Sequence, residues 1–143
     1  PRYLLWHPVD HIHWELAAPS ATGGTGQGSR FRIVEAFGGN PDHYVDSVEF
    51  VEKLDTSGIA LVKRVAGTEI FRLEHHFGTE STGASYRSRM AVGIESGPLR
   101  AVFNRMVRPR VFSDAMGTAW LRHNIEEVSM LEHLLPALYA ARR

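Results

Sequence analysis

Residues 113–140, SDAMGTAWLRHNIEEVSMLEHLLPALYA, decide the fold. Apolar residues recur here at helical spacing, which predicts one long helix near the C-terminus. Ser113 is a typical N-cap residue, and Asp114 favours the first turn through the helix dipole. The apolar stripe of this helix consists of Met116, Trp120, Leu131, Leu134 and Leu138. We therefore expect the stripe to face the core and Glu132 to face solvent.

Two polar residues, His123 and Glu127, lie inside this apolar stripe and one helical turn apart. Burying an imidazole and a carboxylate costs several kcal/mol unless the groups are paired or bind a metal. A His followed by a Glu four residues later can direct a nitrogen and a carboxylate oxygen to one point. The motif therefore indicates either half of a metal site or a buried His–Glu ion pair, and both interpretations stay open here.

The composition is that of an ordinary globular protein. The chain has 143 residues, of which 43 % are hydrophobic and 22 % charged, with 16 basic and 16 acidic side chains. We expect one domain over residues 1–143, large enough for a sizeable core. The chain has no cysteine, which excludes disulfides and thiolate chemistry.

Charge and hydropathy limit the partners that we expect. The balanced charge gives no sign of a nucleic-acid partner, and no apolar run has transmembrane length. A cytoplasmic location fits these features. The sequence starts at Pro1 without a Met, which is consistent with a fragment that lacks an N-terminal region.

The part before the helix reads mainly as strands. The predicted strands cover residues 2–16 (with a break at Pro8), 30–37, 59–65, 68–77 and 85–95. Residues 42–54 could form a helix or a strand, 99–107 could form a short helix, and Ala66-Gly67 is a hairpin signal. Strands followed by a long helix are an α+β layout. We expect a curved antiparallel sheet around the C-terminal helix, enclosing a cavity.

Further metal ligands are sought on the predicted strands. Glu35 alternates with Phe31 and Ile33 on one strand face, so we expect it to point inward; the alternative is a strand-end carboxylate in solvent. Several His residues crowd the start of the chain, and this density indicates that one of them is a ligand. Two His and two carboxylates suit zinc, and also manganese or ferrous iron.

A second polar group is expected inside the sheet. His75 shares a strand face with Leu73 and Phe77, whereas His76 lies on the opposite face. An inward His75 could hydrogen-bond a substrate or transfer a proton. Tyr86 could add a hydroxyl group. The structural alternative for these residues is a core His bonded to the backbone beside a packing tyrosine.

Several of these motifs resemble one known family. The segments YLLWHPVDH (3–11), FRIVE (31–35) and LRHNIEE (121–127) resemble the 2,4-diacetylphloroglucinol hydrolase family, as do YRSR (86–89) and LPALY (135–139). The match covers most of this chain but only the catalytic part of the family, whose members carry an extra N-terminal region. The resemblance implies a helix-grip fold, like that of the birch-pollen-allergen superfamily. It also implies a zinc ion held by two His and two Glu, and hydrolysis of a carbon–carbon bond next to a ketone in a phenolic substrate.

The resemblance transfers the metal ligands to four positions. The helical ligands of the family fall on His123 and Glu127, and the strand ligand falls on Glu35. The first His of the family falls within WHPVDH, where we prefer His11 and keep His7 as the alternative.

The resemblance also implies residues that act on the substrate. The cavity His of the family falls on His75, with which we group Tyr86 as a catalytic residue. We expect Tyr3 and His7 to contact the substrate.

Two classes of function follow from these observations. We expect a zinc-dependent hydrolase that cleaves the carbon–carbon bond beside a ketone in a small aromatic substrate such as an acylated phenol. The alternative is a helix-grip carrier or sensor that binds an apolar aromatic compound without catalysis. A metal-dependent ester hydrolase is a third, weaker interpretation. The sequence does not decide the oligomeric state, and a homodimer is one of the alternatives.

Overall fold

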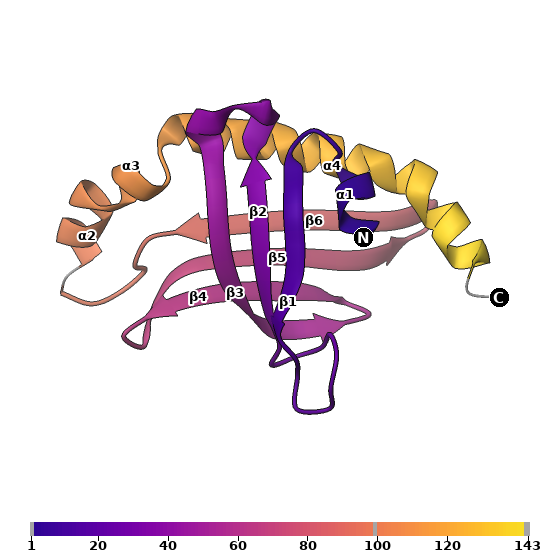
Figure 1. Ribbon diagram of the computed structural model, residues 1–143, viewed down its shortest axis with the longest axis horizontal. Coiled ribbons are helices and arrows are strands. Elements are labelled where there is room, and N and C mark those ends of the chain that lie inside the picture. Colours follow the sequence, from indigo (N-terminus) through magenta and orange to yellow (C-terminus); the bar gives the residue numbers. More distant parts are fainter. Residues whose placement is uncertain (1, 99, 142–143) are drawn as a thin grey trace. The chain divides into compact units, whose positions relative to one another are not determined.

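The computed structural model describes residues 2–98 and 100–141. Within these residues, six strands form one antiparallel sheet in the order β1-β2-β3-β4-β5-β6, and the long helix α4 (Asp114–Ala140) ends the chain (Figure 1). This is the α+β class that the sequence predicts. No described helix combines the length and the apolar character needed to cross a membrane.

The remaining elements precede α4. They are α1 (Arg2–Trp6), β1 (His11–Ala18), β2 (Arg30–Ala36), η1 (Phe37–Gly39), η2 (Pro41–His43), β3 (Tyr44–Asp55), β4 (Gly58–Val65), β5 (Thr68–Glu80), β6 (Gly83–Val92), α2 (Arg100–Met106) and α3 (Arg108–Val111). The predicted strands near residues 30–37, 59–65, 68–77 and 85–95 are confirmed, as is the short helix near 99–107. The ambiguous segment 42–54 is mostly strand.

The start of the chain corrects the sequence prediction. Residues 2–16 are not one broken strand, because α1 precedes β1. Aromatic residues favour strands by propensity, but long-range contacts override that weak preference. The indole Nε1 of Trp6 donates a hydrogen bond of 3.0 Å to the carbonyl oxygen of Glu127, and the ring of Tyr3 stacks on His11 with the centroids 3.9 Å apart. A helix this short is held by such contacts rather than by its own stability.

Contacts divide the chain into two compact units. The first unit comprises the described parts of residues 1–14, 33–47 and 114–143, and the second comprises those of 15–32 and 48–113. In the first unit, η1 packs against α4, as does α1 (Figure 1). The arrangement of the sheet around α4 stays a prediction.

The register of α4 agrees with the apolar stripe. Met116 is buried, Trp120 and Leu131 are half-buried, and Glu132 is exposed. Leu134 and Leu138 are also half-buried. The helix therefore turns the predicted face inward, and this face carries His123 and Glu127.

The second unit contains the β4–β5 hairpin and the long β5–β6 ladder. Ala66 and Gly67 connect β4 to β5 with positive φ angles of 48° and 79°, as a type I′ turn requires. The β5–β6 ladder pairs His75 with Ser88 and Phe77 with Tyr86. Directly paired residues share a sheet face, so the ladder brings the side chains of His75 and Ser88 together.

Candidate metal centre

The four predicted ligands all belong to the first unit. His123 and Glu127 lie on α4, His11 begins β1, and Glu35 lies near the end of β2. The exposed fractions of His11, His123 and Glu127 are only 4 %, 3 % and 6 %, and that of the Glu35 side chain is 15 %. One potential ligand atom from each of His11, Glu35 and His123 lies within 4.8 Å of the other two. These three groups form a cluster that could hold a metal ion, and Glu127 lies beside them, with its Oε1 3.6 Å from Nε2 of His11.

His11 presents a buried nitrogen without a hydrogen-bond partner. Its Nδ1 lies 2.8 Å from the carbonyl oxygen of Tyr3. Because a carbonyl oxygen only accepts, Nδ1 carries the proton and Nε2 of the neutral ring keeps a lone pair. Nε2 has no hydrogen-bond partner among the described residues and lies 3.5 Å from Oε1 of Glu35 and 3.6 Å from Oε1 of Glu127. Burial lowers the pKa of His11 to about 4, so the ring is neutral at pH 7.

His123 is held in a similar way by a different acceptor. Its Nδ1 lies 2.9 Å from Oδ2 of Asp10, and its Nε2 lies 3.9 Å from Oε2 of Glu127. Burial lowers the pKa of His123. The pKa of Asp10 is also lowered, because hydrogen bonds from the Gly38 backbone and from His123 outweigh the effect of burial. An ionised Asp10 therefore accepts the Nδ1 proton, which leaves the lone pair of His123 on Nε2.

The two carboxylates, half-buried Glu35 and buried Glu127, have no Lys or Arg partner among the described residues. Burial raises the pKa of Glu35 to about 7, although the Tyr3 hydroxyl donates a hydrogen bond to its Oε1. Burial and the charge of Glu35 raise the pKa of Glu127 to about 8. Neither carboxylate forms an ion pair with a Lys or Arg side chain among the described residues. Acceptor lone pairs that face each other are repulsive unless a proton or a cation lies between them.

The imidazole and carboxylate donors of this cluster could bind a metal ion, and zinc is one metal with this ligand preference. Zinc binds imidazole nitrogen and carboxylate oxygen at 2.0–2.2 Å, usually with tetrahedral geometry, so neighbouring ligand atoms lie roughly 3.4 Å apart. Nε2 of His11 lies 3.5 Å from Oε1 of Glu35 and 3.6 Å from Oε1 of Glu127, close to that value, whereas Nε2 of His123 lies 3.9 Å from the other oxygen of Glu127, Oε2. The buried Nε2 of His11, which no protein group satisfies among the described residues, supports the same fit.

His7, the alternative first ligand, has both ring nitrogens engaged. Its Nδ1 accepts the backbone N–H of Asp10 at 3.2 Å, and its Nε2 lies 3.3 Å from Oε2 of Glu126. One ligand atom each from His7, Asp10 and His123 also lies within 4.8 Å of the others. His7 also lines a cleft of about 550 Å³ in the first unit, together with Arg122 and Ile125. The geometry favours His11 as the ligand, and the assignment stays a prediction.

The predicted catalytic residues His75 and Tyr86 lie in the second unit. The Tyr86 hydroxyl and Nδ1 of His75 form a hydrogen bond. Burial, followed by the nearby His76, lowers the pKa of His75 to about 4. His75 is half-buried and His76 is exposed, as strand alternation predicts. The structure thus joins His75 and Tyr86 in one polar pair, while their catalytic role stays a prediction.

Two polar residues of interest were missed by sequence reasoning. Asp10 is 1 % exposed and bonds to His123, and Ser88 faces His75 across the ladder with a buried Oγ that has no hydrogen-bond partner among the described residues. Ser88 could have been identified from the sequence, because it lies two residues after Tyr86 and therefore on the same face of the predicted strand. No periodic signal marks Asp10, because it lies in the turn between α1 and β1.

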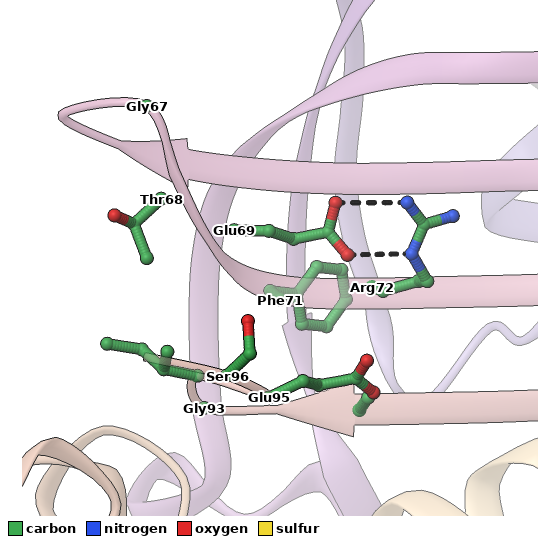
Figure 2. Close-up of a pocket in the computed structure, with 10 residues that line it drawn as sticks. Gly67, Thr68, Glu69, Phe71, Arg72, Gly93, Glu95 and Ser96 are labelled. Carbon is green, nitrogen blue, oxygen red and sulfur yellow. Dashed lines mark hydrogen bonds and ion pairs between the residues drawn. The ribbon is translucent and has the colours of Figure 1, made fainter. Parts of the chain in front are cut away.

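A second hollow, of about 400 Å³, lies beside β5 and β6 in the second unit (Figure 2). Gly67, Phe71 and Ser96 contribute to its lining. The guanidinium of Arg72 donates to both oxygens of Glu69, at 2.7 and 3.0 Å, and Figure 2 shows this paired contact. Arg72 also lies 2.7 Å from Glu52. Since carboxylates of the protein already surround this cation, we assign the cluster a structural role.

Comparison of the chain with protein-family models, with curated proteins and with solved structures finds no significant match. The resemblance to the 2,4-diacetylphloroglucinol hydrolase family therefore depends on the short motifs of the sequence. What the fold contributes independently is an α+β architecture and a buried His and carboxylate cluster.

Proposed function

We propose that this chain is a zinc-dependent hydrolase that cleaves the carbon–carbon bond beside a ketone in an acylated phenol. One observation carries the proposal. The lone pair on buried Nε2 of His11 faces the carboxyl groups of Glu35 and Glu127, 3.5 and 3.6 Å away, and has no hydrogen-bond partner among the described residues. Such an arrangement is stabilised by a cation, and the donor set suits zinc.

In this proposal His11, Glu35, His123 and Glu127 hold the ion. A zinc ion bound there would supply a Lewis acid that polarises a ketone oxygen. Tyr3 donates to Glu35 and so orients that carboxylate. The Tyr3 hydroxyl thus lies at the rim of the donor set, which agrees with its expected contact with the substrate.

His75 and Tyr86 are proposed to act on the aromatic part of the substrate. Because the pKa of His75 is about 4, its ring is neutral at pH 7. A neutral ring can donate a hydrogen bond, but it has no imidazolium proton to transfer. If Nδ1 accepts the Tyr86 proton, then Nε2 carries a proton that it can donate to a phenolic oxygen. That contact would stabilise negative charge on the ring as the bond to the acyl carbon breaks.

The net reaction consumes one water molecule. The acyl carbon gains a hydroxyl group and leaves as a carboxylic acid, while the ring carbon gains a proton in place of the acyl group. No oxidant or second cofactor is required. The choice of substrate rests on the motif resemblance, whereas the metal site rests on the geometry of the first unit.

The test is an assay of the zinc-loaded protein with an acylated phloroglucinol and with a phenyl ester of the same acid. We expect release of the carboxylic acid and the deacylated phenol from the ketone, dependent on zinc. Hydrolysis of the ester alone would instead support the ester hydrolase. Tight binding of the aromatic ketone by a protein that holds no zinc would support the carrier.

A further inference from the structure

Asp10 is the most deeply buried carboxylate of the first unit that the proposed ligand set does not use. It lies between α1 and β1 and is 1 % exposed. A buried carboxylate persists only where donors satisfy it. Its surroundings therefore indicate what the side chain does.

Both oxygens of Asp10 accept hydrogen bonds, from donors of different kinds. Oδ1 accepts the backbone N–H of Gly39 at 3.1 Å, which ties the carboxylate to η1. Oδ2 accepts Nδ1–H of His123 at 2.9 Å. The backbone N–H cannot change its role, whereas the imidazole can exist in either tautomer. Asp10 is thus fixed by η1 and acts on the ring of His123.

We propose that Asp10 is a positioning residue that fixes the tautomer and ring orientation of His123, so that Nε2 faces Glu127 and is available to a metal ion. This inference rests on the proposed zinc site. Metal-binding histidines commonly donate their other ring N–H to a carboxylate or a carbonyl, which orients the ring and raises the basicity of the ligand nitrogen. Asp10 supplies the carboxylate in this relationship.

The same arrangement recurs at His11 with a weaker acceptor. There the Nδ1 proton goes to the Tyr3 carbonyl, 2.8 Å away. Each proposed imidazole ligand therefore has its Nδ1 proton held by an acceptor on or beside the α1 segment. Because only Asp10 carries a full charge, we expect its loss to change zinc affinity.

A second metal ion bound by His7, Asp10 and His123 is the competing interpretation of the same residues. An ion there would have to displace the hydrogen bond between Asp10 and His123 and the contact of His7 Nε2 with Glu126. Both oxygens of Asp10, both nitrogens of His7 and Nδ1 of His123 already have hydrogen-bond partners, unlike Nε2 of His11. The positioning role therefore requires no rearrangement, and a second ion does.

Asp10→Asn tests the proposal because an amide has one acceptor and one donor end. If the amide oxygen keeps the Gly39 N–H, its NH₂ group faces Nδ1 of His123 and forces the proton onto Nε2, where it blocks the ligand lone pair. The same logic makes an Asp-to-Asn change disable a catalytic histidine. We expect zinc affinity to fall by roughly the 10–100-fold typical of such supporting residues. Asp42→Asn, at an exposed Asp of η2 in the same unit, is the matched control and should change nothing.

The ¹⁵N NMR spectrum of the His123 ring shows which ring nitrogen carries the proton. A purely structural role of Asp10 would leave this spectrum unchanged. The native protein should show the Nδ1–H tautomer both without metal and with one zinc bound. Asp10→Asn should show the Nε2–H tautomer without metal, with an unchanged far-UV circular dichroism spectrum.

The outcomes separate this inference from the proposed function. Failure of the native protein to bind zinc would refute the metal site, while the native tautomer would still report on Asp10. Three results would each overturn the positioning role. They are an Nε2–H tautomer of His123 in native protein that binds zinc, two zinc ions per chain, and equal zinc affinity in native protein and folded Asp10→Asn. If Asp10→Asn does not fold, the native tautomer and stoichiometry decide the question alone.

Discussion

Glu52 of the second unit and the pair Glu35 and Glu127 of the first unit lie in opposite electrostatic surroundings. In the second unit, Glu52 lies 2.6 Å from Arg64 and 2.7 Å from Arg72, on a surface that remains open to water. In the first unit, Glu127 is buried and Glu35 is half-buried, and no described Lys or Arg side chain pairs with them. The second unit therefore supplies cations for Glu52, whereas the first unit pairs Arg122 with Glu126 but offers no described Lys or Arg to Glu35 and Glu127.

The pKa values follow the same division. Hydrogen bonds from Arg72 and Arg64 lower the pKa of Glu52, whereas burial raises the pKa of Glu35 to about 7 and that of Glu127 to about 8. Buried carboxylates without partners are costly, and proteins retain them mostly at functional sites. The difference supports the proposal that the cluster of the first unit binds a cation from outside the chain.

Removal of the proposed ligands on α4 should have the largest effect on zinc affinity. We expect His123→Ala and Glu127→Ala to lose more zinc affinity than the roughly 10–100-fold typical of supporting residues, because each removes a ligand atom. His133→Ala and Glu132→Gln, at exposed positions of the same helix, are matched controls that should bind zinc like the native protein. Elemental analysis after dialysis measures the retained metal. Full zinc content in both Ala variants would contradict the proposed metal site in the first unit.

A comparison of His11 with His7 sharpens the location of the site. His11→Ala should lose zinc, because it removes the nitrogen that faces Glu35 and Glu127. His7→Ala should retain most of it, because both nitrogens of His7 are engaged elsewhere. The same zinc analysis decides between them. The reverse result would move the first ligand to His7, and retention by both would exclude the N-terminal segment from the site.

Substitution of the proposed catalytic residue in the second unit should lower activity without changing the zinc content. His75→Ala is expected to keep zinc but to lower turnover of an acylated phenol by roughly 10²–10⁴, as for a lost acid–base or hydrogen-bonding group. His76→Ala, at the adjacent exposed position, should be nearly silent. Rates are compared at equal zinc content. Full activity of His75→Ala would leave the His75–Tyr86 pair as structural.

Metal-free stability should respond to pH with opposite signs in the two units. The folded pKa of Glu127, about 8, exceeds its ordinary value of 4.5, so ionisation costs stability as pH rises from about 4.5 to above 8. Glu127→Gln should therefore raise the metal-free unfolding free energy at pH 9 by about 1–3 kcal/mol, and the gain should vanish near pH 4.5.

Glu52→Gln is the matched substitution in the second unit. The lowered pKa of Glu52 contributes stability above its unfolded pKa that is lost as pH falls, and solvent screens this contribution. Its replacement should cost at most about 1 kcal/mol at pH 9. Urea unfolding at both pH values measures the two effects, and equal signs for the two variants would contradict the comparison.

The sequence was informative wherever the signal is local. The spacing of Met116, Trp120 and Leu131 sets the register of α4, and that register alone predicts that His123 and Glu127 turn inward. Alternation predicted β2 and the different exposures of His75 and His76. These patterns need only neighbouring residues, so one sequence is enough to read them.

Long-range contacts account for what the sequence did not reveal. The α1 helix depends on Trp6 reaching Glu127 and on Tyr3 stacking over His11, which no local pattern encodes. Asp10 was missed because its partner His123 lies 113 residues away. The choice between His7 and His11 likewise required the hydrogen bonds of each ring.

The most direct test of the central claim is calorimetric titration of the metal-free native protein with zinc near pH 7, repeated in buffers of different ionisation enthalpy. The account predicts saturation at one ion per chain with release of protons, because the pKa values of Glu35 and Glu127 leave these carboxyls partly protonated before zinc binds. Absence of saturable binding, or binding that persists unchanged in Glu127→Ala, would contradict it.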